Sequence, residues 1–244
     1  FELQVGHLRR ARSPGPLAQF PYVSMVARNL SDSQVRHRRQ THIRRQRQRW
    51  HHARLDGPDS EKNVNRTVEA ICTGTARPFN GAETSAIAKR PREGVIQLLE
   101  DGFAPDEQAD RKVHGGPEKA VHLYPLAHHA FWRNELTNPG ALALLDQYGA
   151  FGSNLAVNDM TESDVHIGDR FRLGSALVEV NQPRQPCWKV DHRFGTKGMV
   201  KTIVETGRCG WYFRVLEWGE VRSGDMLERV AAGHTGASHG FSLL

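Results

Sequence analysis

The second half of the chain alternates apolar and polar positions in a way that predicts β-strands. Within residues 176–181, Glu179 and Asn181 fall on one face of an extended segment, while alanine and valine side chains fall on the other. Residues 170–173 and 211–215 alternate in the same manner. Because successive side chains of a strand point to opposite faces, a period of two indicates strands with one face packed on a core.

The first half of the chain adds further short segments with a β-type pattern, at residues 68–74, 95–99 and 120–124. Several short strands separated by glycine-rich turns are typical of a β-barrel or a β-sandwich. The sequence therefore predicts a mainly β fold with a few short helices, an α+β arrangement around a barrel-like core.

Two short helices are expected beside the strands. The first is predicted to open at Pro125 and to break at residues 138–140, which read Asn-Pro-Gly. Its expected apolar face consists of Leu126, Ala127, Ala130 and Phe131. The second helix is predicted over residues 199–206, and Gly207 ends it.

The positive charge of the chain is concentrated near its N-terminal end. The net charge of +6 comes from 33 Lys and Arg against 27 Asp and Glu, and residues 1–65 hold 13 of the basic and 5 of the acidic residues. Residues 66–244 therefore carry 20 basic and 22 acidic residues, a net charge of −2. This part lacks the basic character of nucleic-acid-binding domains, so nucleic acid is not expected as its partner.

Composition divides the chain into three regions. Residues 35–52 contain almost no apolar side chains, so they cannot bury enough surface to offset the entropy of folding. We predict a disordered Arg-rich extension over residues 1–65, a folded domain over 66–230 and a disordered tail over 231–244. The extension is interpreted as a solvated tail, or as sequence upstream of the true start. The alternative is a basic arm that binds nucleic acid or another anionic surface.

The cellular setting is indicated by what the sequence contains. No stretch approaches the roughly 20 apolar residues needed to span a bilayer, so no membrane partner is expected. The first residues do not resemble a secretory signal. An odd number of cysteines, three in all, does not form a disulfide framework. The sequence therefore predicts a reducing, cytoplasmic compartment.

Cys187 is the strongest candidate for a chemical role. It lies in a loop with Pro183 and Pro186, which restrict the backbone and fix the direction of the thiol. Arg184 and Lys189 flank it, and neighbouring positive charge favours the thiolate, the form that binds metals or attacks electrophiles. The residues alone leave three roles open, which are a structural thiol, a metal ligand and a nucleophile.

Two other segments are rich in groups that bind ligands. The first ends in a Gly-Gly pair whose backbone can approach a ligand closely. Its candidate residues are Asp106, Gln108, Asp110, His114, Gly115 and Gly116. The second segment, residues 151–155, offers Asn154. Either segment is alternatively an ordinary solvated turn.

The other histidine pairs lack the spacing of a metal site. His51 and His52, like His128 and His129, have no acidic or cysteine partner at a suitable distance along the chain. We interpret both pairs as incidental.

Taken together, these segments resemble the MOSC family, in particular its YiiM-like branch. The similarity runs in family order over roughly residues 66–230, and its central motif is the run Gln-Pro-Arg-x-Pro-Cys that ends at Cys187. The matching blocks are residues 69–74, 83–91, 106–117, 151–155, 166–169, 182–188 and 209–211.

The resemblance implies a barrel-like MOSC fold and a molybdenum-pterin cofactor, with Cys187 as the protein ligand of molybdenum. It implies an oxidoreductase that reduces N-hydroxylated small molecules such as 6-hydroxylaminopurine, with a separate flavin reductase as electron donor. Pyridoxal phosphate binding is a further family-level expectation, and a homodimer is a further expected partner. The residues that the family position assigns to the cofactor or substrate are Arg184, His114, Gly115, Gly116, Asn154, Asp106, Gln108 and Asp110. The alternative is a carrier of the cofactor, or of sulfur, without turnover.

The chain departs from the family pattern at two places near the expected site. Ala104 and Pro105 stand where family members usually have Glu-Gly, and Ser153 stands where they usually have Glu. Proline fixes φ where glycine leaves it free, so the departure at Pro105 bears on the shape of the loop that begins at Asp106.

Overall fold

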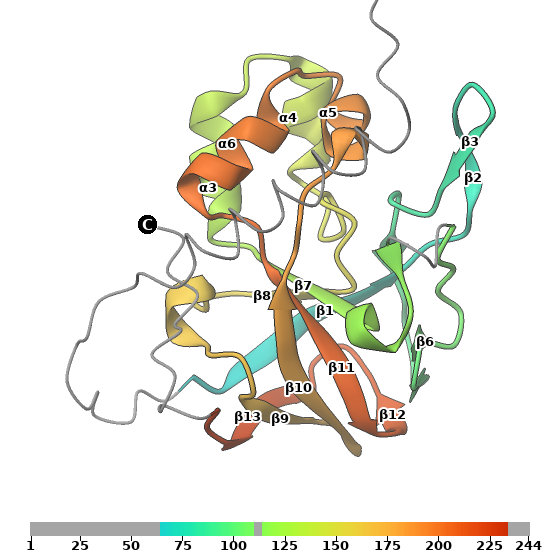
Figure 1. Cartoon of the computed structure of the whole chain (residues 1–244), viewed down its shortest axis with the longest axis vertical. Coiled ribbons are helices and arrows are strands. Elements are labelled where there is room, and N and C mark those ends of the chain that lie inside the picture. Colours follow the sequence, from blue (N-terminus) through green and yellow to red (C-terminus); the bar gives the residue numbers. More distant parts are fainter. Residues whose placement is uncertain (1–63, 110–113, 234–244) are drawn as a thin grey trace, which may run out of the picture. The chain divides into compact units, whose positions relative to one another are not determined.

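A closed β-barrel forms the core of the computed structural model, which describes residues 64–109 and 114–233 (Figure 1). Its strands follow the order β13-β9-β10-β11-β7-β8-β1, and β13 pairs with β1 to close the ring. The strands are β1 (Arg66–Thr73), β7 (Val121–Pro125), β8 (Leu155–Val157), β9 (Arg170–Leu173), β10 (Ala176–Pro183), β11 (Trp211–Glu217) and β13 (Met226–Ala231). The predicted mainly β fold with a barrel-like core is confirmed.

Apolar side chains at alternate strand positions fill the barrel. The side chains predicted on one face of residues 176–180 are all fully buried, as are those of Trp211 and Phe213. They pack with buried side chains from the other strands, including Val68, Ile71, Leu123, Leu155, Val157, Phe171, Leu173 and Leu227. The period of two therefore identified the inward face of these strands correctly.

Neighbouring strands of the ring are antiparallel except for β7 and β8, which run parallel with Leu123 opposite Leu155. A parallel pair needs a long crossover connection. Here the connection carries the helices α3 (His128–Glu135) and α4 (Pro139–Leu144).

Four short helices gather at one end of the barrel (Figure 1). Besides α3 and α4, they are α5 (Trp188–Phe194) and α6 (Met199–Thr206). They share a second apolar core that contains Trp132, Phe151, Phe194 and Ile203. Helix α6 has the predicted bounds, and Gly207 ends it in the left-handed region with φ of 75°.

The first predicted helix was wrong in its start and in its buried face. Pro125 ends β7, where it pairs with Val157, so the helix begins only at His128. Of the expected apolar face, Ala127 and Ala130 are exposed. The residues that α3 buries are His128, His129 and Trp132. The reason is that both histidines find hydrogen-bond partners inside, which the apolar periodicity could not show.

Small elements complete the described part. The β2–β3 hairpin projects from the barrel (Figure 1). These elements are β2 (Arg77–Asn80), β3 (Glu83–Ser85), β4 (Arg90–Pro91), β5 (Ile96–Leu99), β6 (Gly102–Phe103), η1 (Pro117–Lys119), η2 (Glu162–Asp164) and β12 (Gly219–Val221). β5, β6 and β12 form a separate three-stranded sheet, while β4 pairs with β1.

Several predictions concern residues outside the described ranges. They are the N-terminal extension up to residue 63, the pair His51-His52, Asp110 and the tail from residue 234. At the C-terminal end, β13 continues to Ala231, and the N–H of Gly233 donates to Asp169 at 2.6 Å. In the part of the chain that the structure describes, no helix has the length and apolar character to cross a membrane.

Candidate functional site

A pocket of about 640 Å³, its open mouth included, brings together most of the residues expected from the sequence. Cys187, Arg184 and Asn154 line it, together with Asp106, Gln108 and His114. Asp106 and Cys187, which lie 81 positions apart in the sequence, therefore share one cavity.

Three adjacent strands supply one wall of the pocket. In the sheet, Tyr212 of β11 lies opposite His122 of β7 on one side and opposite Gln182 of β10 on the other. Their neighbours Leu123 and Trp211 point into the barrel, so His122 and Tyr212 point outward. The two rings are 5.2 Å apart between centroids, and both line the pocket.

Cys187 stands at the start of α5, where its backbone is still extended with φ of −129°. The residue is half-buried and lines the pocket. It belongs to the short segment that joins β10 to α5. That the prolines fix the direction of its thiol stays a prediction. A role for Cys187 as a metal ligand stays a prediction.

The other two thiols are placed differently. Burial raises the pKa of Cys72 to about 12, and the nearby Lys89 opposes this only in part. Burial also raises the pKa of Cys209 well above its usual value, and Glu162 adds to the rise. Both thiols are fully buried in apolar cores and stay protonated. Of the three cysteines, all of which the structure describes, Cys187 is the one that lines the pocket.

Arg184 is a buried cation that the described residues leave partly unpaired. Its side chain is only 7% exposed, and its Nη1 has no hydrogen-bond partner in the described part of the chain. Its backbone N–H donates to the carbonyl of Gly210 at 3.0 Å, and the N–H of Gly210 donates to the buried carboxylate of Glu162 at 2.6 Å. These contacts fix the backbone at Arg184, and its guanidinium hydrogen-bonds Tyr212. Arg184 thus brings a positive charge to the pocket wall, which fits an anionic or polar ligand.

His128 contributes to this support. Its Nε2 lies 2.7 Å from the other carboxylate oxygen of Glu162, and the Nδ1 of His129 lies 2.8 Å from the carbonyl of Leu145. Both rings are therefore buried structural groups between α3 and its surroundings, a role that the sequence reasoning did not assign to this pair.

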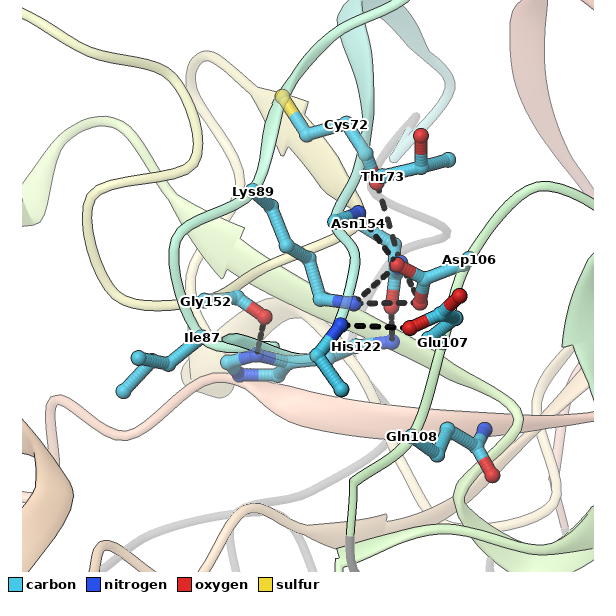
Figure 2. Close-up of polar contacts among 12 residues, drawn as sticks. Cys72, Thr73, Ile87, Lys89, Asp106, Glu107, Gln108, His122, Gly152 and Asn154 are labelled. Carbon is cyan, nitrogen blue, oxygen red and sulfur yellow. Dashed lines mark hydrogen bonds and ion pairs between the residues drawn. The ribbon is translucent and has the colours of Figure 1, made fainter. Parts of the chain in front are cut away.

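Asp106 is the centre of a buried polar network in the pocket wall (Figure 2). Its carboxylate forms an ion pair with Lys89 and accepts hydrogen bonds from the N–H of Gly74 at 2.7 Å and from Asn154 Nδ2 at 2.8 Å. Asn154 Nδ2 also donates to the carbonyl of Cys72, and its Oδ1 accepts the N–H of His122. These contacts tie the Asp106 loop to β1 and β7, so the polar atoms of both side chains are already used inside the protein.

Pro105 does not prevent this arrangement. The N–H of Asp106 donates to the carbonyl of Phe103 at 2.8 Å, which closes a turn that contains Pro105. Ser153, the other departure from the family pattern, is buried and its hydroxyl donates to the carbonyl of Tyr148 at 3.3 Å. Asp106 therefore reaches its partners with proline in the loop.

The Gly-Gly pair approaches a side chain of its own loop. Gln108 donates to the carbonyl of Asp101 at 2.7 Å and accepts the N–H of Gly116 at 2.9 Å. A side chain at Gly115 would collide with Gln108, and Gly116 has a positive φ of 84°. His114 lines the pocket, whereas these two glycines do not. Their assignment to the cofactor stays a prediction, as does that of Asp110, which lies outside the described residues.

Four basic or aromatic pocket residues were missed by the sequence reasoning, and they are Lys89, Lys119, His122 and Tyr212. They come from separate elements, so no local motif unites them. The alternation of β7 and β11 could have placed His122 and Tyr212 on the outward face. With these residues included, four basic and two acidic side chains line the pocket, and the negative charge of Asp106 is balanced by Lys89. The cavity therefore has a positive excess.

His122 is a buried ring in the pocket wall. It is 4% exposed, its Nδ1 lies 3.4 Å from the carbonyl of Gly152, and its Nε2 lies close to the backbone of Cys209 and Gly210 (Figure 2). Burial lowers the pKa of His122 to about 3, and the positive charge of Arg184 adds to this effect. The ring is therefore neutral at physiological pH.

The structure thus defines a class of protein, a small β-barrel with a cationic pocket that presents one cysteine thiol. Within residues 64–109 and 114–233, no group of three or more His, Cys, Asp or Glu side chains is arranged to hold a metal ion.

Comparison with known proteins identifies the family. The MOSC domain model matches residues 110–228. The protein YiiM of Escherichia coli (strain K12) is 38% identical over 161 residues, which cover 66% of this chain and 70% of that protein. Its crystal structure superposes with a TM-score of 0.56, covering 69% of this chain and 70% of the other. The chain belongs to the MOSC family, in its YiiM-like branch, as the resemblance indicated.

Two further relatives extend the comparison. The uncharacterized protein YflK of Bacillus subtilis (strain 168) is 46% identical over 158 residues, covering 65% of this chain and 69% of that protein. A protein of Gibberella moniliformis (strain M3125 / FGSC 7600) with the name "Reductase" is 42% identical over 155 residues. That match covers 62% of this chain and 27% of the fungal protein.

Proposed function

We propose that this chain binds a molybdenum-pterin cofactor in the pocket and reduces N-hydroxylated small molecules such as hydroxylaminopurines. One observation carries the proposal, namely that the accessible thiol of Cys187 shares a cavity with the buried, partly unpaired cation Arg184. Membership of the YiiM-like branch supports the cofactor, since the resemblance implies it. The name of the fungal relative supports oxidoreductase activity.

The residues of the pocket fit such a cofactor. A thiolate is a soft ligand that suits molybdenum, and Cys187 is the residue that would supply it. Lys119, Lys189 and Arg184 line the same cavity and bring the positive charge that a phosphate group requires. Asp106 and Asn154 would act less directly, by holding the wall against which the cofactor rests.

When bound, the cofactor would supply two-electron oxygen-removal chemistry. The overall conversion of an N–OH group to N–H consumes two electrons and two protons and releases one water molecule. A separate flavin reductase would provide the electrons. The residues of the chain would bind the N-hydroxylated molecule and orient it beside Cys187. An accessible thiol used in this way requires a reducing compartment, which favours the cytoplasm.

The proposal is tested on wild-type protein made in a molybdenum-replete host. We expect near-stoichiometric molybdenum by plasma mass spectrometry, and formation of adenine from 6-hydroxylaminopurine when NADH and a flavin reductase are supplied. Folded, pure protein without molybdenum would contradict the proposal. Bound molybdenum without turnover would instead favour the alternative, a carrier of the cofactor or of sulfur.

A further inference from the structure

Three aromatic rings meet where the β2–β3 hairpin packs against the start of α5. Trp188 and His192 lie four residues apart, on the same face of the helix. Between ring centroids, Phe79 of β2 lies 5.9 Å from Trp188 and 4.6 Å from His192, and Trp188 lies 5.9 Å from His192. His192 Nε2 is also 3.0 Å from the carbonyl oxygen of Phe79. These contacts hold the indole of Trp188 in place.

The indole of Trp188 lies at the edge of the pocket. Trp188 stands between Cys187 and Lys189, and both of these residues line the cavity. The ammonium group of Lys189 is 5.9 Å from the centre of the Trp188 ring, and it donates to the carbonyl of Thr84 at 3.2 Å. Ser85, the next residue of the hairpin, lines the cavity as well. An aromatic side chain therefore borders the pocket on the side where α5 meets the hairpin.

Trp188 is left open to solvent although its neighbours fix its position. It is 43% exposed, whereas Trp132 and Trp211 are 1% and 0% exposed in the two apolar cores. Its planes with Phe79 and His192 make angles of 51° and 72°, so neither ring is stacked parallel on the indole. A large aromatic surface that is held rigidly and left uncovered beside a pocket is suited to stacking a planar ligand.

We infer that Trp188 stacks on the planar ring of the substrate and so selects heteroaromatic N-hydroxylated compounds over non-aromatic ones, which rests on the proposed function for the N-hydroxyl group. Trp188 is therefore a specificity-determining residue, and Phe79 and His192 are positioning residues that act through it. Every flat base has a face that stacks on an aromatic ring, so the contact selects the shape of the ligand and not a pattern of hydrogen bonds.

The test measures dissociation constants by calorimetry on full-length protein whose molybdenum content is known. Trp188→Leu keeps an apolar side chain and removes the ring, so it should weaken 6-hydroxylaminopurine about tenfold, the size of one base–aromatic contact. Adenine has the same ring without the hydroxyl group and should lose the same factor. N-hydroxyurea has the N-hydroxyl group without the ring, and its affinity, measured by competition, should not change. Trp188→Phe keeps an aromatic face and should restore most of the affinity for both purines.

The matched control is Trp218→Leu, which alters a tryptophan that is 64% exposed and does not line the pocket. It should leave all three affinities unchanged, and thermal unfolding on each preparation confirms the fold. Unchanged purine binding in Trp188→Leu, or the same loss in Trp218→Leu, overturns the inference.

The fate of molybdenum separates this inference from the proposed function. Loss of molybdenum from folded Trp188→Leu overturns the inference, because the ring would then hold the cofactor. Ring-dependent purine binding by a wild type without molybdenum leaves the stacking role standing and removes the proposed function. Reduction of 6-hydroxylaminopurine with an unchanged KM in Trp188→Leu does the reverse.

Discussion

Protein that carries Cys187→Ser is expected to lose at least about nine-tenths of its molybdenum, because a serine oxygen replaces the soft sulfur ligand. Reduction of N-hydroxylated compounds should fall with the metal. The fold should be retained, since Cys187 occupies the N-cap of α5 in extended conformation, a position where serine is among the favoured residues. Metal content by plasma mass spectrometry and thermal unfolding, measured on the same preparation, separate loss of the ligand from loss of the fold.

The other cysteines provide matched controls for this variant. Cys72 and Cys209 are buried and do not line the pocket, so Cys72→Ala and Cys209→Ala each remove a thiol without touching the proposed ligand. Both variants should keep their molybdenum, normalised to folded protein. Full molybdenum in Cys187→Ser, or equal losses in all three variants, would show that Cys187 is not the ligand.

The barrel could be predicted because its strands carry the pattern of the fold within a few consecutive residues. Residues 170–173 and 176–183 alternate cleanly, since one of their faces lies in the barrel interior. Closure of the ring could not be predicted in the same way. It depends on the pairing of β13 with β1, whose paired residues Leu227 and Arg66 are far apart in the sequence and carry no local signal.

Helix α3 shows where the apolar pattern fails. Its buried face contains His128 and His129. These polar rings can be buried because the carboxylate of Glu162 and the backbone carbonyl of Leu145, both distant in the sequence, accept hydrogen bonds from them. Periodicity counts apolar residues and therefore assigns the wrong face when hydrogen bonds replace apolar contacts.

The residues of the candidate site also fall into two groups, those that lie close together in the sequence and those that meet only in the folded chain. Cys187 and Arg184 share one short loop, so the sequence placed them together. His122, Tyr212 and Lys89 come from elements that meet only in the folded chain, and a single residue in each gives no motif. Asp106 and Asn154 were expected to hold a ligand, but their polar atoms serve mainly to join the loop to the barrel.

Because Asp106 joins its loop to the barrel, Asp106→Ala is the variant with the largest expected loss of stability. Asp106 and Lys89 are 4% and 9% exposed in their side chains, and removal of the carboxylate leaves a buried ammonium group without its partner. Burial lowers the pKa of Lys89, and Asp106 opposes this, so the charged lysine depends on the pair. Breaking a buried ion pair from one side costs about 3–5 kcal/mol. We expect a loss of this size in the free energy of unfolding, measured with urea.

A double variant distinguishes the ion pair from simple loss of packing. The combination of Asp106→Asn with Lys89→Met removes both buried charges. This double variant should be more stable than the summed effects of Asp106→Asn alone and Lys89→Met alone predict. The matched control is an exposed ion pair on α6, in which Lys201 Nζ lies 3.7 Å from Glu205 Oε1. Alanine at either position should change the free energy of unfolding by less than about 1 kcal/mol. If Asp106→Ala were as mild as Lys201→Ala, the carboxylate would not anchor the loop, and the pocket wall would depend on other contacts.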